Sequence, residues 1–420
     1  MQSKGTSIAA LALGVALAAT ALPALADPVT ITLGSWRTED LAVWQDKILP
    51  VFMAEHPDIK VEFAPTNTNE YNAAIQSQVE GGAGPDLITC RPFDVNNEWI
   101  GRGYFTKLDG LDGLGNFDDT AKAAWSTGGS TYCVPVAAVL AGFYYNIDIF
   151  NELGLKVPTT QAEFIDVLQK IKDNGKYAPL AEGTSESWQL AYNGLYSVGP
   201  AYWKGEEGRL GLIDGSKKLT DPEFVSAFKA IDDWKPFLPS GYQSIAYADM
   251  TQLFTLGKAA ILPDGSWNIN QVTTTGLNVG AFAPPVPKAG DQRYMQEMPD
   301  MGIGINAKSA NQDAAKTFLT WVAGAEFQQL YVNTAPGFFA MSNQKVSYDN
   351  KLAQAFADLK TGAKLTPRLA LDRLSAGTPP LDDETWRVLQ VMFTTGETPE
   401  DATAELQKGL ASWYKPQQGK

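Results

Sequence analysis

A small set of charged and aromatic side chains lies where buried strands are predicted to end. Carboxylates accept hydrogen bonds and guanidinium groups donate them in pairs, which suits adjacent hydroxyl groups, and each charge-assisted bond contributes about 1.5–3 kcal/mol. An indole ring adds a flat apolar face on which a sugar ring, a base or another aromatic ring can lie. The candidates are Trp36, Arg37, Glu39 and Asp40 after the first strand, Arg91 and Asp94 after the third, and Asp264 and Trp267 later in the chain.

These residues also have purely structural interpretations. Glu39 and Asp40 lie in the first turn of a predicted helix, where the helix dipole favours acidic residues without any ligand. Trp267, like Trp36, could instead pack between domains, and Asp94 could pair with Arg91 within one loop. The sequence leaves these alternatives open.

The sequence contains no recognised catalytic motif. It has no G-x-S-x-G elbow, no H-E-x-x-H pair and no P-loop. The single histidine, His56, directly precedes Pro57, where a helix must end, and this favours a surface position over a role as metal ligand. We therefore expect a binding protein without cofactor or metal rather than an enzyme.

The elements that must position the candidate residues form a pattern typical of α/β proteins. Apolar alternation at 29–33 and 59–63, and a short apolar run at 87–90, predict strands. Helices are predicted between them, after residue 40 and over 70–79. Ligands of parallel sheets bind at the carboxyl ends of the strands. The loops at 34–40 and 91–96 follow two such ends.

Later segments predict how a second domain is joined to the first. Strands at 132–137 and 142–146, separated by small residues, suggest a crossing between domains. Residues 254–268 predict a helix end, a glycine stop at Gly257, a buried strand at 259–262 and a tight turn at 263–265 that presents Trp267. One long amphipathic helix is predicted over 312–330.

Composition limits the class of protein. A chain of 420 residues exceeds what one hydrophobic core usually serves, which predicts two domains. The net charge of −14 argues against a nucleic acid or an anionic membrane surface as partner.

Residues 1–26 carry Lys4, an apolar run and a small-residue cleavage site, which predict a signal peptide. That segment has no cysteine, so we expect a soluble periplasmic protein without a membrane anchor. An oxidising compartment permits Cys90 and Cys133 to pair, but the sequence does not decide whether they do.

A series of motifs spread over nearly the whole mature chain resembles one known family. The chain is similar to the bacterial extracellular solute-binding proteins of family 1, the maltose-binding type, which are the periplasmic components of ABC sugar importers. The motifs are Gly84-Pro85-Asp86-Leu87-Ile88, Val134-Pro135-Val136, Gly142-Phe143-Tyr144-Tyr145-Asn146, Gly257-Lys258-Ala259-Ala260, Asp264-Gly265-Ser266-Trp267, Gly304-Ile305-Asn306-Ala307-Lys308-Ser309 and Thr398-Pro399-Glu400-Asp401-Ala402.

The resemblance implies a type II periplasmic binding protein fold with two α/β lobes that close over a ligand. Each lobe would be built from discontinuous segments: 27–137 with about 300–337 for the N-terminal lobe, and 138–299 with about 338–420 for the C-terminal lobe. Hinge crossings would lie near 137–140, 284–299 and 335–339. The implied partners are a carbohydrate and the permease subunits of an ABC importer, and the protein would be a monomer.

The resemblance also extends the set of candidate residues. The first-strand loop, now including Thr38, and the third-strand loop from Cys90 fall where the family contacts sugar hydroxyls. Trp267 falls on an aromatic residue that stacks on a pyranose face, and Ser187 and Trp188 lie near another contacting loop.

One departure from the maltose-binding pattern bears on the ligand. The family's maltose-binding member has a carboxylate after the first crossing, where this chain has Ala138, Val139 and Leu140. The first-strand loop looks more like the subgroup that handles raffinose-type α-linked oligosaccharides. We therefore predict capture of an α-linked di- or oligosaccharide. The alternatives are an exported glycoside hydrolase or a binding protein for a non-sugar solute.

Overall fold

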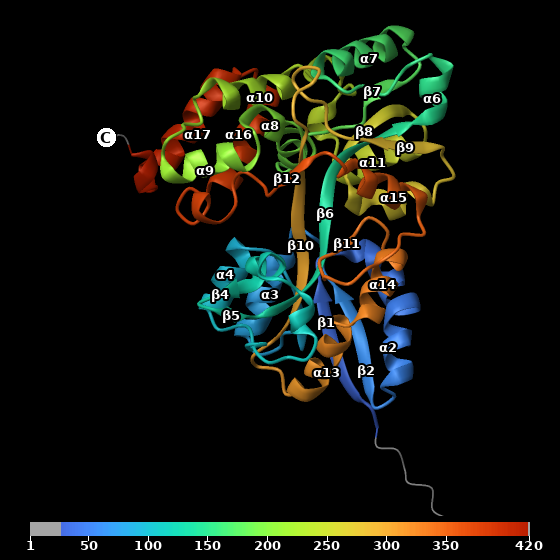
Figure 1. Cartoon of the computed structure of the whole chain (residues 1–420), viewed down its shortest axis with the longest axis vertical. Helices are drawn as coiled ribbons and strands as arrows, with labels where there is room; N and C mark the ends of the chain where they lie inside the picture. The colour runs from blue at the N-terminus through green and yellow to red at the C-terminus, as the bar shows by residue number, and fades with distance from the viewer. Residues whose placement is uncertain (1–26, 419–420) are drawn as a thin grey trace, which may run out of the picture.

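The computed structural model describes residues 27–418, which form two α/β lobes joined by strands that run through both (Figure 1). The predicted signal peptide, 1–26, lies outside the described residues. Within 27–418 no helix has the length and apolar character needed to cross a membrane. The strands are β1 (Val29–Ser35), β2 (Ile59–Pro65), β3 (Leu87–Cys90), β4 (Ser126–Thr127), β5 (Ser130–Thr131), β6 (Cys133–Asn146), β7 (Ala178–Leu180), β8 (Ala259–Gly265), β9 (Val279–Phe282), β10 (Tyr294–Ile305), β11 (Phe339–Ala340) and β12 (Lys364–Thr366).

The N-terminal lobe contains the predicted parallel β-α-β units. β1 pairs in parallel with β2, from Val29 opposite Ile59 to Ser35 opposite Pro65, and also with β3. Buried and exposed residues alternate along β2, so one face of this edge strand packs on the core. The helices of this lobe are α1 (Leu41–Val43), α2 (Leu49–Glu55), α3 (Tyr71–Glu80), α4 (Asp94–Gly101), α5 (Asp119–Lys122), α13 (Gln312–Val322) and α14 (Ala325–Thr334).

β6 is the strand that connects the two lobes most directly. The prediction of two strands at 132–137 and 142–146 was wrong, because one continuous strand of 14 residues runs through both (Figure 1). The alanines at 137, 138 and 141 carry little strand propensity by themselves. They are nevertheless paired there, with β10 at Ala137 to Leu140 and with β8 from Ala141 onward. Strand pairing therefore overrides local composition at the crossing.

The sheet follows the order β2-β1-β3-β10-β6-β8-β7, so β10 is the second strand that passes between the lobes. β10 runs antiparallel to both β3 and β6. β11 adds a short third connection by pairing with Ala137 and Ala138 of β6. Three chain segments thus lie side by side where the lobes meet.

The C-terminal lobe is rich in helices. The prediction of a tight turn at 263–265 was wrong, because these residues continue strand β8 and pair with β6. Pro263 is tolerated there because the pairing of β7 with β8 ends at Ile261. The helices are α6 (Ile147–Glu152), α7 (Gln161–Asn174), α8 (Tyr196–Trp203), α9 (Glu206–Asp214), α10 (Pro222–Asp232), α11 (Tyr247–Thr255), α12 (Ile269–Thr273), α15 (Lys351–Leu359), α16 (Leu381–Thr395) and α17 (Pro399–Trp413).

The segment 312–330 forms two helices, not the one long helix predicted. α13 ends at Val322, and α14 begins after Gly324, whose backbone is extended with φ −83° and ψ 161°. The apolar periodicity continues across this break, which is why the sequence pattern conceals it.

The buried cores divide along the same crossing strands. One core gathers apolar residues from 31–139 and 298–338, and a second gathers them from 143–282 and 369–410. A disulfide joins Cys90 at the end of β3 to Cys133 at the start of β6, the two strands that flank β10. A Cβ atom on Gly304 of β10 would lie 2.9 Å from the sulfur of Cys133. Glycine is therefore required beneath the disulfide.

Candidate ligand-binding site

The first-strand loop after β1 is organised by a buried ion pair. Arg37 is 7 % exposed, and its Nη2 donates to Oδ1 of Asp40 at 3.2 Å while its Nε donates to the same carboxylate. Its Nη1 lies 3.2 Å from Oε1 of Glu39, and its guanidinium lies over the ring of Phe338. Arg37 and Asp40 thus satisfy each other, while Thr38 and Glu39 remain exposed.

Arg91 is stacked on the aromatic residue of the first-strand loop. Its guanidinium carbon lies 4.1 Å from the ring centroid of Trp36, which is itself buried against Tyr71. Nη2 of Arg91 donates to the carbonyl oxygen of Thr68 at 3.2 Å. Burial lowers the pKa of Arg91 to about 10, which leaves it charged at neutral pH. The predicted residues Trp36 and Arg91 are therefore brought together.

Asp94 and Cys90 lie at opposite ends of the third-strand loop and differ in access. Cys90 is fully buried and its sulfur is bonded to Cys133, so it does not join the accessible residues. Asp94 opens α4 and forms no ion pair with Arg91 in the described chain. Burial raises the pKa of Asp94 to about 6, while the charge of Arg368 from the C-terminal lobe partly opposes the rise. The charge of Arg368 thus acts on the pKa of Asp94 from the other lobe.

A chain of hydrogen bonds through two other residues fixes the orientation of the Trp267 side chain. Its Nε1 donates to the hydroxyl of Tyr247 at 2.8 Å, and that hydroxyl donates to Oδ2 of Asp264 at 3.0 Å. Asp264 is fully buried, and burial raises its pKa to about 7. A Cβ atom on Gly265 would lie 1.8 Å from the Trp267 ring, so only glycine fits beneath it. Asp264 thus positions the indole and is not exposed to a ligand.

Trp188 extends this aromatic surface. Its ring centroid lies 5.0 Å from that of Tyr247 and 6.0 Å from that of Tyr192, and its Nε1 donates to Glu186 at 2.8 Å. Ser187 is half-buried beside it. We call Trp188, Tyr192, Tyr247 and Trp267 the aromatic wall. Tyr192 and Trp267 also pack against the core of the N-terminal lobe, so the aromatic wall faces that lobe.

Several polar residues near these groups were not predicted. Arg368 lies over the ring of Tyr192, donates to its hydroxyl, and forms an ion pair with Asp382 at 3.1 Å. Asp300 of β10 is half-buried among the charges of Arg37 and Arg91. Arg368 lies in a stretch without periodicity, so no sequence signal pointed to it. Asp300 lies shortly before the motif that begins at Gly304, but nothing in the sequence showed which segments are its neighbours.

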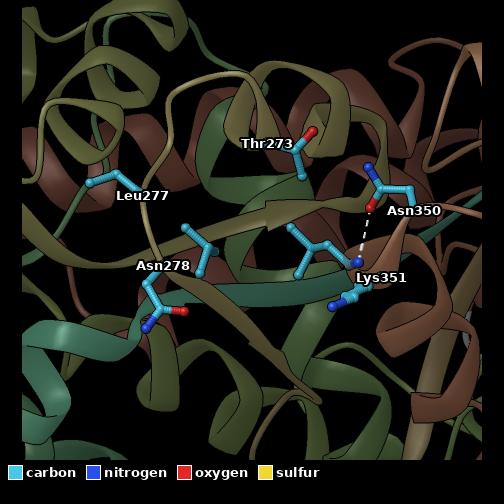
Figure 2. Close-up of a pocket in the computed structure, with 7 residues that line it drawn as sticks. Thr273, Leu277, Asn278, Asn350 and Lys351 are labelled. Atoms are coloured by element: carbon cyan, nitrogen blue, oxygen red, sulfur yellow. Dashed lines mark hydrogen bonds between the residues drawn. The ribbon is translucent and has the colours of Figure 1, made fainter.

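Two hollows on the surface lie away from all of these residues. One, of about 260 Å³, is formed in the C-terminal lobe, and another, of about 200 Å³, includes Tyr294 at the start of β10. Figure 2 shows the larger one, where Oδ1 of Asn350 accepts a bond from the amide of Leu352 and so caps α15. The larger hollow is lined by Thr273, Leu277, Asn278, Val279, Asn350, Lys351 and Leu352. Neither hollow contains a residue predicted for the site.

Comparison with known proteins decides the family. Residues 34–329 match the model of the bacterial extracellular solute-binding proteins. The chain belongs to this family. A multiple sugar-binding protein of Streptococcus mutans is 27 % identical over 317 residues, which cover 73 % of each chain. A mannitol-binding protein of Pseudomonas aeruginosa is 26 % identical over 332 residues, covering 75 % of this chain and 74 % of that one. A solved structure of a solute-binding protein in complex with raffinose has a TM-score of 0.76 at 22 % identity, covering 93 % of this chain and 100 % of that one.

In this solute-binding protein the charged candidate residues and the aromatic wall come from different lobes. The N-terminal lobe supplies charged donors and acceptors from Glu39, Arg91 and Asp94, while the C-terminal lobe supplies the aromatic wall. Within 27–418 no group of three or more histidine, cysteine, aspartate or glutamate residues is arranged to hold a metal ion. The charged groups can donate hydrogen bonds to hydroxyl groups and accept hydrogen bonds from them, and the aromatic rings present apolar faces.

Proposed function

We propose that this protein captures a carbohydrate, an α-linked di- or oligosaccharide, between its lobes and delivers it to the permease subunits of an ABC importer. The observation that carries the proposal is that the aromatic wall belongs to one lobe and the charged loops to the other, with Tyr192 and Trp267 of the wall packed against the core of the N-terminal lobe. Pyranose rings present apolar faces and hydroxyl edges, so they can use both surfaces at once. Sugar-binding relatives in the same family support this reading.

We propose that the protein acts in the periplasm as a monomer without a membrane anchor, after removal of residues 1–26. The sequence features of that segment support export. The family to which the chain belongs is extracellular, which fits the same compartment.

Lobe closure supplies the proposed mechanism of capture. We propose that 27–137 with 300–337 and 138–299 with 338–420 move as two bodies about β6, β10 and β11. Contacts from both lobes exist only when the lobes close, so a ligand shifts the equilibrium by its differential affinity for the closed form. The permease would then recognise the closed shape.

Calorimetric titration against a panel of mono-, di- and trisaccharides tests the proposal. We expect stoichiometric binding of at least one α-linked oligosaccharide, and a thermal shift, since ligand at ~100 times its dissociation constant adds about 2.7 kcal/mol to stability. Absence of binding and of any shift with every sugar would contradict the proposal. Binding of mannitol alone would instead favour a receptor for acyclic polyols.

An exported glycoside hydrolase is the second candidate. Such an enzyme needs two carboxyl groups ~5–9.5 Å apart across the scissile bond. Incubation of the protein with the bound oligosaccharide, followed by chromatography, separates the two functions. Release of shorter sugars would favour the hydrolase, and intact recovery of the ligand is expected for a receptor.

A further inference from the structure

Asp300 occupies an irregular position on the hinge strand β10. Pro299 pairs with Ala138 and Met301 pairs with Ala137, so Asp300 is an extra residue with no partner on β6. Such a bulge bends the strand and changes the direction of the side chain. Bulges are frequent beside functional sites, where they direct a side chain that regular pairing would turn elsewhere.

Asp300 is half-buried, and one of its two carboxylate oxygens has no hydrogen-bond partner in the described part of the chain. Its Oδ2 is inaccessible and accepts no hydrogen bond from any of residues 27–418. Burial raises the pKa of Asp300 to about 6, although the charges of Arg37 and Arg91 act in the opposite direction. Neither arginine forms an ion pair with it in the described chain. A buried polar atom of this kind requires an explanation, because native proteins satisfy nearly all of them.

The two neighbouring arginines differ in how many of their side-chain nitrogens remain free to donate a hydrogen bond. Arg37 has its Nε, Nη1 and Nη2 engaged by Asp40 and Glu39. Arg91 uses its Nε for Asn72 and its Nη2 for the Thr68 carbonyl, while its Nη1 has no partner among 27–418. Gly302 of β10 pairs with Cys90 of β3, so Asp300 and Arg91 both lie just beyond that pair, at the same end of the two strands. An unused acceptor on Asp300 and an unused donor on Arg91 therefore lie in one region, where Arg91 stacks on the Trp36 ring.

We propose that Asp300 is a specificity-determining residue of the site: its carboxylate accepts a hydrogen bond from one ligand hydroxyl while Arg91 donates to the oxygen of the adjacent hydroxyl. The ligand must then present two neighbouring hydroxyl groups at the end of the site beside β10. This inference rests on the proposed carbohydrate-binding function. It adds a requirement on the ligand, a vicinal diol, that the aromatic wall does not impose.

The rival role for Asp300 is structural, as a counter-charge for the two arginines. The two roles predict opposite effects on stability. A counter-charge stabilises the fold, so Asp300→Asn would lower the unfolding midpoint. A carboxylate that serves to bind ligand has no partner in the free protein, and this lowers the stability of the fold. Asp300→Asn is then expected to leave the unfolding midpoint unchanged or to raise it.

The experiment combines calorimetry with thermal unfolding on the full-length mature protein. The probes are the oligosaccharide that binds tightest in the panel and its monodeoxy analogues, and the matched control is Asp313→Asn, a fully exposed aspartate on α13. Loss of one charge-assisted bond of about 1.5–3 kcal/mol corresponds to roughly 10- to 150-fold weaker binding. We expect Asp300→Asn to show this loss without a lower midpoint, and Asp313→Asn to bind as the wild type does.

The deoxy analogues identify the hydroxyl and keep the inference separate from the broader proposal. The wild type should reject one monodeoxy analogue strongly, and Asp300→Asn should bind that analogue and the parent sugar with similar affinity. Wild-type binding combined with unchanged affinity in Asp300→Asn, or with equal discrimination in both proteins, would overturn the role of Asp300 alone. Failure of the wild type to bind any carbohydrate would overturn both proposals.

Discussion

Trp267 has its orientation fixed by residues that lie behind it. The indole nitrogen bonds Tyr247, the Tyr247 hydroxyl bonds Asp264, and Gly265 leaves room for the ring. From the sequence, both Asp264 and Trp267 were predicted to contact the ligand, Asp264 through its carboxylate and Trp267 through its ring face. Their difference depends on burial, which the local pattern of β8 does not reveal, because every residue of that strand is buried.

Replacement of Trp267 tests the aromatic wall at the scale of one side chain. Trp267→Ala should weaken carbohydrate binding by at most a few kcal/mol, because a stacked aromatic contributes ~0.5–1.5 kcal/mol beyond the area that it buries. Calorimetry with the best ligand measures the change. Trp267→Phe is the matched control, since it keeps a ring face and loses only the bond to Tyr247, and it should bind better than the alanine variant. Equal affinity of all three proteins would remove Trp267 from the site.

At the scale of elements, the parallel units β1, β2 and β3 were predictable because their apolar patterns are strong and local. The crossing strand β6 was not, since its small residues acquire strand structure from β10, a partner some 160 residues further along the chain. Asp300 and Arg368 were missed for a related reason. Their neighbours come from distant segments, and a single sequence does not report which segments meet.

The disulfide between β3 and β6 supports the element that crosses between the lobes. Its cysteines are separated by 43 residues, and closing a loop of that size stabilises a protein by about 4 kcal/mol in the chain-entropy model. The double variant Cys90→Ala, Cys133→Ala should therefore lose about 2–4 kcal/mol in chemical denaturation. Wild type denatured with a reductant present is the control and should lose a similar amount. A variant as stable as the oxidised wild type would show that the bond contributes nothing.

At the scale of the whole molecule, three carboxylates of the candidate site have raised pKa values. Burial raises the pKa of Asp94 and of Asp300 to about 6 and that of Asp264 to about 7. Each group binds its proton more tightly in the folded chain than in the unfolded chain. Ionisation of these groups at neutral pH therefore lowers the free energy of unfolding, and the groups responsible belong to the proposed site.

Without ligand, the free energy of unfolding is therefore expected to be highest at a mildly acidic pH. The folded pKa values exceed the unfolded value near 3.9, so each group adds stability as the pH falls from about 7 to about 5, on the order of 1 kcal/mol. Other carboxylates have a lowered pKa, such as Glu163 through its hydrogen bonds from Thr159. These lose their stabilising contribution when they are protonated below about pH 4. Unfolding midpoints measured from pH 8 to 3 should rise and then fall.

Asp264→Asn provides the matched comparison for this pH profile. The amide cannot ionise, so the rise in midpoint between pH 8 and 6 should be smaller in the variant than in the wild type. A wild-type midpoint that falls steadily from pH 8 to 5 would contradict the assignment of these carboxylates.

The position of the aromatic wall gives the protein an internal optical signal. Trp99, Trp125, Trp203 and Trp234 are almost completely buried, so their fluorescence has a constant environment whichever way the lobes move. Trp188 and Trp267 are only partly covered, and Trp267 packs against the core of the other lobe. Exclusion of water from these two indoles on closure would shift their emission to shorter wavelength. Occupancy of the receptor could then be followed without any attached dye.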